Sequence, residues 1–208
     1  MKKINNYING KICISSSNKF SPVYDPSTGE VQAEVVLSNK EDFDLMIENS
    51  ENSFLEWSAV TPLNRSRVLS KYKTLLEDNK EMLAKLVSQE HGKTLEDAKG
   101  SVTRGIEVVE YACGIPHLLK GEFSQNVGSN IDSWSIRQPL GICAGITPFN
   151  FPAMVPMWMF PISIACGNAF VLKPSEKDPS CPLKLAELFT EAGLPPGVFN
   201  VINGDKEV

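Results

Sequence analysis

Two short segments of the sequence carry residue types that could bind a nucleotide. Residues 147–152 read TPFNFP, and residues 173–177 read KPSEK. In the second segment a carboxylate and an ammonium group could hydrogen-bond the two hydroxyl groups of an adenine ribose. A glutamate at the ribose would also repel a 2′-phosphate, although Lys173 and Lys177 partly offset that repulsion. These residues therefore favour NAD over NADP.

The elements around these two segments alternate between strand and helix. Apolar runs predict strands at 141–147, 169–173 and 198–202, with helices at 152–166 and 182–192 between them. This βαβαβ order is typical of half a doubly wound parallel sheet, in which ligands bind beyond the carboxyl ends of the strands. Both segments follow such a strand. No G-x-G-x-x-G follows the first strand, so pattern alone leaves the cofactor open, and half a sheet is expected to have an exposed edge.

The residues before this region divide into three parts. Short apolar runs and turn signals predict small strands and hairpins in residues 1–37. Helical spacing and capping residues then predict helices at about 40–58, 62–77, 82–91 and 94–118. Residues 121–140 are polar, but Ile131, Trp134 and Ile136 indicate extended chain, so we expect a hairpin that leaves the main body.

Composition excludes several classes of function. The chain has 208 residues and a net charge of −5, with no basic stripe that could bind nucleic acid. The longest apolar run, residues 151–166, contains three prolines and is shorter than the roughly 20 residues that span a bilayer. No signal-peptide core follows Lys2 and Lys3, so we expect a cytoplasmic protein. The five cysteines are widely spaced, which predicts reduced thiols and no metal site.

Three motifs in this order resemble the aldehyde dehydrogenase superfamily. They are TPFNFP at 147–152, GNAFVLKPSE at 167–176 and GLPPGVFNV at 193–201. The resemblance extends over essentially the whole chain. It implies an α/β fold: the amino-terminal part of the aldehyde dehydrogenase fold, with an incomplete Rossmann-like parallel sheet (βαβαβ) preceded by a helical segment and a projecting β-hairpin.

The resemblance also implies a division of labour along the chain. Residues 1–120 would form the amino-terminal strands and helical part of the NAD-binding domain. Residues 121–140 would form a hairpin used in oligomerisation, in a homotetramer when the protein is full length. Residues 141–208 would form the first half of the Rossmann-like core, and the catalytic domain is expected to be absent from these 208 residues.

The superfamily's site residues transfer to the same two segments. Lys173 and Glu176 would hold the adenine ribose with Lys177 beside it, and Thr147 and Phe149 would line the cofactor site. Asn150 would donate its side-chain amide to the oxygen that becomes negative during attack on the aldehyde. Pattern alone favours a simpler interpretation of Asn150, as a turn residue between strand and helix.

Within the superfamily, the chain most resembles the CoA-acylating methylmalonate-semialdehyde dehydrogenases. The resemblance lies in Cys143 (GICAGITPFNFP), the methionine-rich residues 154–159 and Arg104 in TRGIEVVE. An arginine in this helix binds the substrate carboxylate in those enzymes, and a guanidinium group suits that task because it donates two parallel hydrogen bonds. Helical periodicity argues otherwise, since it places Arg104 opposite the apolar stripe, as a solvated surface charge.

The expected reaction needs a cysteine nucleophile that these residues do not supply. None of the five cysteines has the nucleophile's sequence context, and Cys181, which follows a helix start, is more simply a structural thiol. We expect the full-length protein to oxidise malonate or methylmalonate semialdehyde with NAD and coenzyme A, and these 208 residues alone to be inactive. Two alternatives remain: an aldehyde dehydrogenase that transfers the acyl group to water, and a noncatalytic nucleotide-binding or assembly fragment.

Overall fold

The computed structural model describes all 208 residues, and five strands form its central sheet. Their spatial order is β3 (Lys11–Cys13), β2 (Asn6–Ile8), β10 (Phe199–Val201), β9 (Ala169–Lys173) and β8 (Ile142–Ile146). The last three run parallel to one another, and Val171 pairs with Ala144 on one side and Asn200 on the other. The predicted parallel core is therefore confirmed.

The amino-terminal hairpin β2–β3 completes one side of this sheet. Tyr7 of β2 pairs antiparallel with Val201 of β10, so the start of the chain covers the β10 edge. The β10 edge of the parallel strands is thus covered, and the five-stranded sheet ends in open edges at β3 and β8. A second sheet contains β1 (Lys2–Ile4), β5 (Val31–Val36) and β4 (Phe20–Tyr24), in that order.

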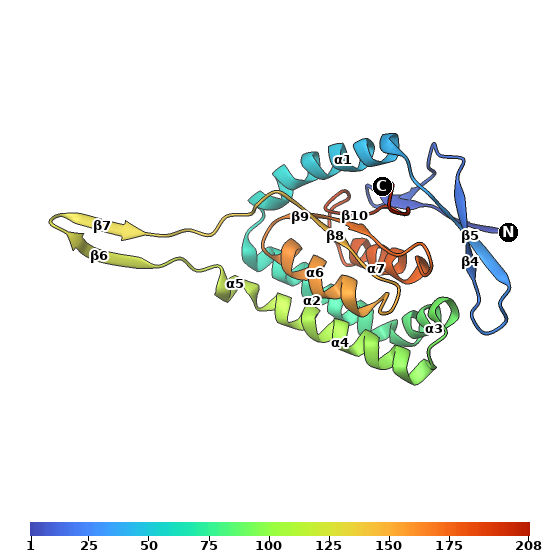
Figure 1. Cartoon of the computed structure of the whole chain (residues 1–208). Helices are drawn as coiled ribbons and strands as arrows, with labels where there is room; N and C mark the ends of the chain where they lie inside the picture. Colours follow the sequence, from blue (N-terminus) through green and yellow to red (C-terminus); the bar gives the residue numbers. More distant parts are fainter.

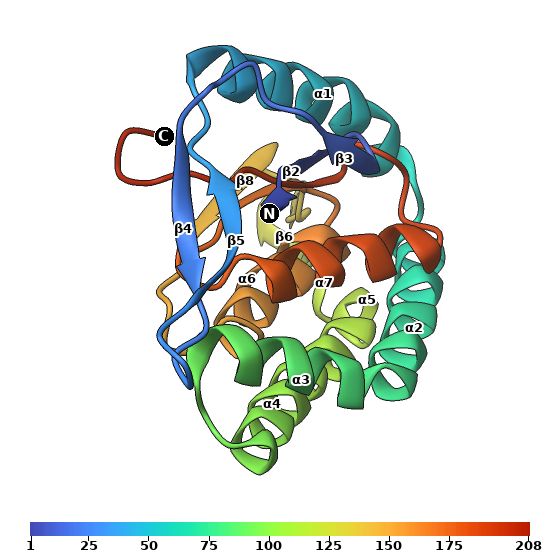
Figure 2. The ribbon, with the colours of Figure 1, turned by 90° about the vertical axis from the view of Figure 1, so that its right-hand side faces the viewer.

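Seven helices surround the central sheet. They are α1 (Lys40–Ala59), α2 (Pro62–Asp78), α3 (Lys80–His91), α4 (Leu95–Cys113), α5 (Ile115–Leu118), α6 (Met154–Ala165) and α7 (Ser180–Glu191). One face of the sheet packs on α1, and the other packs on α6 and α7 (Figures 1 and 2). A further layer of α2, α3 and α4 covers α6 and α7. None of the helices combines the length and apolarity that a bilayer crossing requires.

Capping residues explain where these helices begin and end. Asn39 forms a capping box with Asp42 at the start of α1, and Thr61 caps α2 just before Pro62. Gly92 ends α3 in the left-handed conformation, with φ of 85°. The single predicted helix over 94–118 is wrong in one respect. The chain breaks at Gly114 into α4 and α5, because Pro116 has no N–H to continue the helical hydrogen bonds.

Aromatic rings from four elements fill the space between the sheet and its outer helices. Tyr72 of α2 stacks on Phe189 of α7 with 4.0 Å between ring centroids, and Phe160 of α6 stacks on Phe199 of β10 at 4.3 Å. Tyr72, Phe160 and Phe189 are fully buried. Since aromatic rings bury more apolar area than other side chains, this cluster fixes α6 and α7 against the sheet that carries the site.

A two-stranded hairpin projects from the body, as the sequence predicts. β6 (Phe123–Gly128) pairs antiparallel with β7 (Ile131–Trp134), and these strands pair with no other sheet (Figure 1). Phe123, Ile131 and Trp134 are all more than half exposed. Apolar side chains on an isolated hairpin gain no burial within this chain, so the fold alone gives no reason for them to be there.

Candidate functional site

The first segment of the site follows the end of β8. The backbone N–H of Thr147 donates to the carbonyl of Lys173 at 3.1 Å, which continues the pairing of the two strands by one residue. Thr147 is buried and its hydroxyl oxygen has no hydrogen-bond partner in the chain. Phe149 is 49% exposed and Asn150 is exposed. The strand therefore ends by presenting an aromatic ring and an amide side chain at the surface.

The second segment follows β9, the neighbouring strand. The Lys173 ammonium lies 3.7 Å from a carboxylate oxygen of Glu176 and donates to the carbonyl of Pro174 at 3.0 Å. The Lys177 ammonium lies 4.4 Å from the centroid of the Phe149 ring, within range of a cation–π interaction. The structure thus brings together the five predicted cofactor residues from two segments that lie about 25 residues apart in the sequence.

The geometry of these residues fits a nucleotide. Lys173 and Glu176 form a partly buried ion pair whose remaining donors and acceptors suit two adjacent hydroxyl groups. A buried hydroxyl without a partner, that of Thr147, lies at the end of the neighbouring strand and would gain from a polar ligand. NAD, when bound, would accept a hydride, and Lys173 and Glu176 would hold its adenine ribose.

Arg104 lies on the exposed side of α4, as periodicity indicates, but it also borders a pocket. This pocket, of about 490 Å³, is lined by Arg104, Asn150, Phe151 and Lys93, among others. Gly105 allows α4 to approach α6, since a Cβ at this position would overlap the Met157 side chain. The close packing of these helices places Arg104 beside the segment that carries Asn150.

The cysteines show no sign of an activated nucleophile. All five are free, and burial raises the pKa of the Cys13, Cys113 and Cys166 thiols. Cys181 is fully buried, and burial, with a further contribution from Glu90, raises the pKa of its thiol far above the usual range. A raised pKa keeps a thiol protonated and unreactive. The structural interpretation of Cys181 is therefore the better one.

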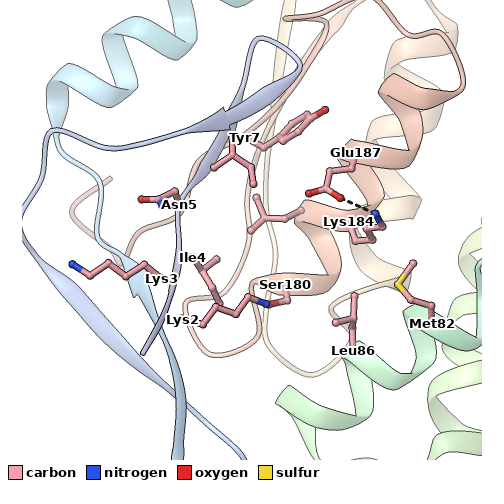
Figure 3. A pocket seen from close by; sticks show the side chains of 12 residues that line it. Lys2, Lys3, Ile4, Asn5, Tyr7, Met82, Leu86, Ser180, Lys184 and Glu187 are labelled. Carbon is pink, nitrogen blue, oxygen red and sulfur yellow. Dashed lines mark hydrogen bonds and ion pairs between the residues drawn. The ribbon is translucent and has the colours of Figure 1, made fainter.

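A second pocket, of about 310 Å³, lies between β1, α3 and α7 (Figure 3). Its wall is partly apolar, with Ile4 and Leu86, and two of its three lysines already interact within the protein. Lys184 pairs with Glu187 at 2.8 Å, and the Lys3 ammonium lies 4.1 Å over the ring of Phe20. None of the predicted site residues lines this pocket. The strand ends remain the better candidate because they combine chemistry-bearing side chains with the expected binding edge of a parallel sheet.

Comparison with known proteins identifies the family. Residues 13–208 match the aldehyde dehydrogenase family. The chain belongs to this family. A malonate-semialdehyde dehydrogenase from Pseudomonas aeruginosa is 54% identical over 207 residues, which cover 100% of this chain and 41% of the relative. The chain therefore spans about two fifths of the length of this relative.

Solved structures of this family match the fold closely. A structure from Sinorhizobium meliloti solved with NAD has a TM-score of 0.98 and 53% identity, over 100% of this chain and 42% of that chain. The methylmalonate-semialdehyde dehydrogenase from Oceanimonas doudoroffii has a TM-score of 0.97 and 51% identity, with the same coverage. The expected fold, the amino-terminal part of an aldehyde dehydrogenase, is thereby confirmed.

The sequence did not predict the residues of the α3 end that contact the two loops of the site. Lys93 donates to the carbonyl of Asn150 at 3.1 Å, and Glu90 accepts from the backbone N–H of Ser180 at 2.9 Å. Asp178 is 2% exposed, between Lys177 and the start of α7. A charged residue at a helix end or in a turn is usually solvated, so the sequence offered no signal for these contacts.

Proposed function

We propose that the whole protein is an NAD-dependent, CoA-acylating dehydrogenase of malonate or methylmalonate semialdehyde. Malonate semialdehyde, coenzyme A and NAD⁺ would yield acetyl-CoA, CO2 and NADH, and the methylated substrate would yield propionyl-CoA. Hydride passes from the aldehyde carbon to NAD⁺, and the thiol sulfur of coenzyme A takes its place on that carbon. The C–C bond to the carboxylate breaks to release CO2, and the electron pair left on carbon takes up the proton that the thiol lost. The 208 residues alone would not turn over, because they offer no activated thiol.

The observation that carries this proposal is the shared pocket of Arg104 and Asn150. A semialdehyde with a carboxylate has one charged end and one reacting end. The Arg104 guanidinium suits the carboxylate, with two parallel hydrogen bonds that fix its orientation. The Asn150 amide suits the oxygen on which negative charge develops during attack. The two groups therefore match the two ends of the proposed substrate.

The cofactor proposal rests on the Lys173–Glu176 pair in the loop after β9. Its carboxylate favours a ribose with a free 2′-hydroxyl group, which is the distinction between NAD and NADP. Phe149 joins the two halves of the site, because it directly precedes Asn150 and its ring lies under the Lys177 ammonium. Cofactor and substrate would thus bind on the two sides of one short loop.

Replacing Arg104 tests the proposed substrate in the complete enzyme. Arg104→Ala should raise the KM for malonate semialdehyde about 10- to 100-fold, since a charge-assisted hydrogen bond contributes roughly 1.5–3 kcal/mol. The KM for propanal, which has no carboxylate, should stay unchanged. Arg67→Ala is the matched control, because Arg67 is also exposed but lies on α2 away from the pocket.

Each contrary result of this experiment has a clear meaning. Equal KM changes for the charged and the neutral aldehyde, or no change at all, would contradict the role of Arg104. Formation of the free acid at the same rate without coenzyme A would favour the alternative enzyme that transfers to water. Absence of turnover with tight NAD binding would favour the noncatalytic alternative.

The hairpin β6–β7 would serve the assembly of the whole protein. Its exposed apolar side chains include Phe123, Ile131 and Trp134, and they need a partner surface to become buried. We propose that this surface belongs to another copy of the same protein, in a homotetramer. The outer edges of the hairpin favour the same outcome, because their unpaired backbone groups can pair with the sheet of another copy.

A further inference from the structure

The end of helix α3 is held rigidly by the residues around it. Gly92 adopts a φ of 85°, and a Cβ there would lie 2.7 Å from the side chain of Pro26. The hydroxyl of Ser88 donates to the carbonyl of Lys93 at 2.8 Å. The Gln32 side chain of β5 donates to the carbonyl of Gln89 at 2.9 Å. This segment is thereby fixed against the β4–β5 turn as well as on its own helix.

Two side chains of this fixed segment reach the two loops of the site. The Lys93 ammonium donates to the carbonyl of Asn150 at 3.1 Å and lies 4.2 Å from the centroid of the Phe151 ring. The Glu90 carboxylate accepts the backbone N–H of Ser180 at 2.9 Å, where the loop after β9 enters α7. One segment of the chain therefore contacts the loop after β8 and the far end of the loop after β9.

We propose that Glu90 and Lys93 are positioning residues that set the two site loops relative to each other. This inference rests on the proposed function, because it assigns Asn150 and Glu176 to substrate and cofactor. Lys93 holds only the backbone of Asn150, which leaves the side-chain amide free to point at the reacting oxygen. Glu90 fixes the end of the loop that begins with Lys173 and carries Glu176.

Each of these two contacts joins a charged side chain to a neutral backbone group. An ammonium donor and a carboxylate acceptor make hydrogen bonds roughly twice as strong as neutral ones. The charged groups that face this cluster come from several elements: Lys2 of β1, Asp97 of α4, and Glu176 and Asp178 of the loop after β9. Burial is the main influence on both residues, raising the pKa of Glu90 and lowering that of Lys93. Partial burial strengthens the Glu90 contact further, whereas the Lys93 contact lies at the surface.

Hydrogen–deuterium exchange on the complete protein, with no substrate added, tests whether Glu90 and Lys93 hold the two loops. Lys93→Met should raise exchange in residues 147–153 about tenfold, and Glu90→Ala should raise it about tenfold in residues 174–181. Lys93→Arg and Glu90→Gln keep a donor and an acceptor, so they should restore most of the protection. Exchange in β9 and β10, which serve as the internal control, should not change.

Steady-state kinetics of the complete enzyme then distinguish a positioning role from a general loss of structure. Lys93→Met should lower kcat about tenfold with little change in the KM for NAD, whereas Glu90→Ala should raise that KM about tenfold at nearly constant kcat. Unchanged exchange in both loops, or an equal rise in every peptide, would overturn the inference. If Glu90→Ala does not fold, the comparison of Lys93→Met with Lys93→Arg tests the inference. The exchange results could show that Glu90 and Lys93 position the loops in a wild-type enzyme that does not bind NAD. That outcome would support the positioning role and refute the proposed function.

Discussion

The loops that follow β8 and β9 begin at neighbouring parallel strands, yet their polar side chains differ in exposure and in their contacts with the protein. After β8, Asn150 is exposed, and only its backbone carbonyl is bound, by Lys93. After β9, Lys173 and Glu176 form an ion pair, and Asp178 is only 2% exposed. One loop presents a free side chain on a fixed backbone, and the other holds its ionisable side chains against the protein.

This difference suits two different tasks. A group that stabilises charge in a transition state must be aimed in advance but must not be occupied by another partner. A group that binds a stable part of a cofactor benefits from a charge network that fixes its position before binding. The two loops therefore separate the proposed chemistry from the proposed binding, although about 25 residues and one helix lie between them in the sequence.

The largest effect is expected from the exposed side chain of the first loop. Asn150→Ala in the complete enzyme should lower kcat about 10²- to 10³-fold, as the loss of one oxyanion donor does elsewhere. The KM for NAD should change little, since the backbone contact with Lys93 is kept. Steady-state kinetics with malonate semialdehyde measures both quantities. An unchanged kcat would restore the simpler interpretation of Asn150 as a turn residue.

The buried carboxyl of the second loop should make stability depend on pH. Burial, aided by the nearby Glu90 charge, raises the pKa of Asp178 to about 8. In the unfolded chain an aspartate ionises near pH 4. Because the folded state disfavours the ionised form, the free energy of unfolding should fall as pH rises from about 4 to about 8. At about 1.4 kcal/mol per pH unit, the loss over this range should reach roughly 5 kcal/mol.

Asp178→Asn removes this titration and should make the free energy of unfolding less dependent on pH. The variant should gain roughly 4 kcal/mol relative to wild type between pH 5 and pH 9. Its stability at pH 5 should be slightly lower, because the new amide brings buried donors that need partners. Urea unfolding at pH 5, 7 and 9 measures the difference, with Asp44→Asn on the exposed side of α1 as the control. Parallel curves for wild type and Asp178→Asn would show that Asp178 is ionised in the folded protein.

The strands, the two site loops and most helix ends could be predicted from the sequence, because local signals determine them. The strands at β8, β9 and β10 are continuous apolar runs, and both site loops follow directly from them. The helix starts at Asn39 and Thr61 and the helix end at Gly92 also follow from short capping motifs. The break between α4 and α5 was missed, since the apolar periodicity continues across Gly114 and hides the effect of Pro116.

Contacts between distant parts of the chain could not be predicted in the same way. The pairing of Tyr7 with Val201 and the contact of Glu90 with Ser180 leave no pattern in either local segment. Arg104 shows the same limit. Periodicity locates the apolar side of α4 correctly, but it cannot show that the opposite side faces the loop of Asn150.

The smallest effect is expected from the ion pair of the second loop. Glu176→Gln in the complete enzyme should weaken NAD binding about tenfold. The amide of glutamine still accepts a hydrogen bond, but a bond to a charged group is stronger by roughly 1.5 kcal/mol. The variant should also discriminate less against NADP, since the carboxylate that repels the 2′-phosphate is gone. Kinetics with both cofactors measures this, with Glu191→Gln at the exposed end of α7 as the control. A variant that keeps the wild-type preference for NAD would assign cofactor choice to residues other than the Lys173–Glu176 pair, while an unchanged NAD affinity would remove Glu176 from the ribose altogether.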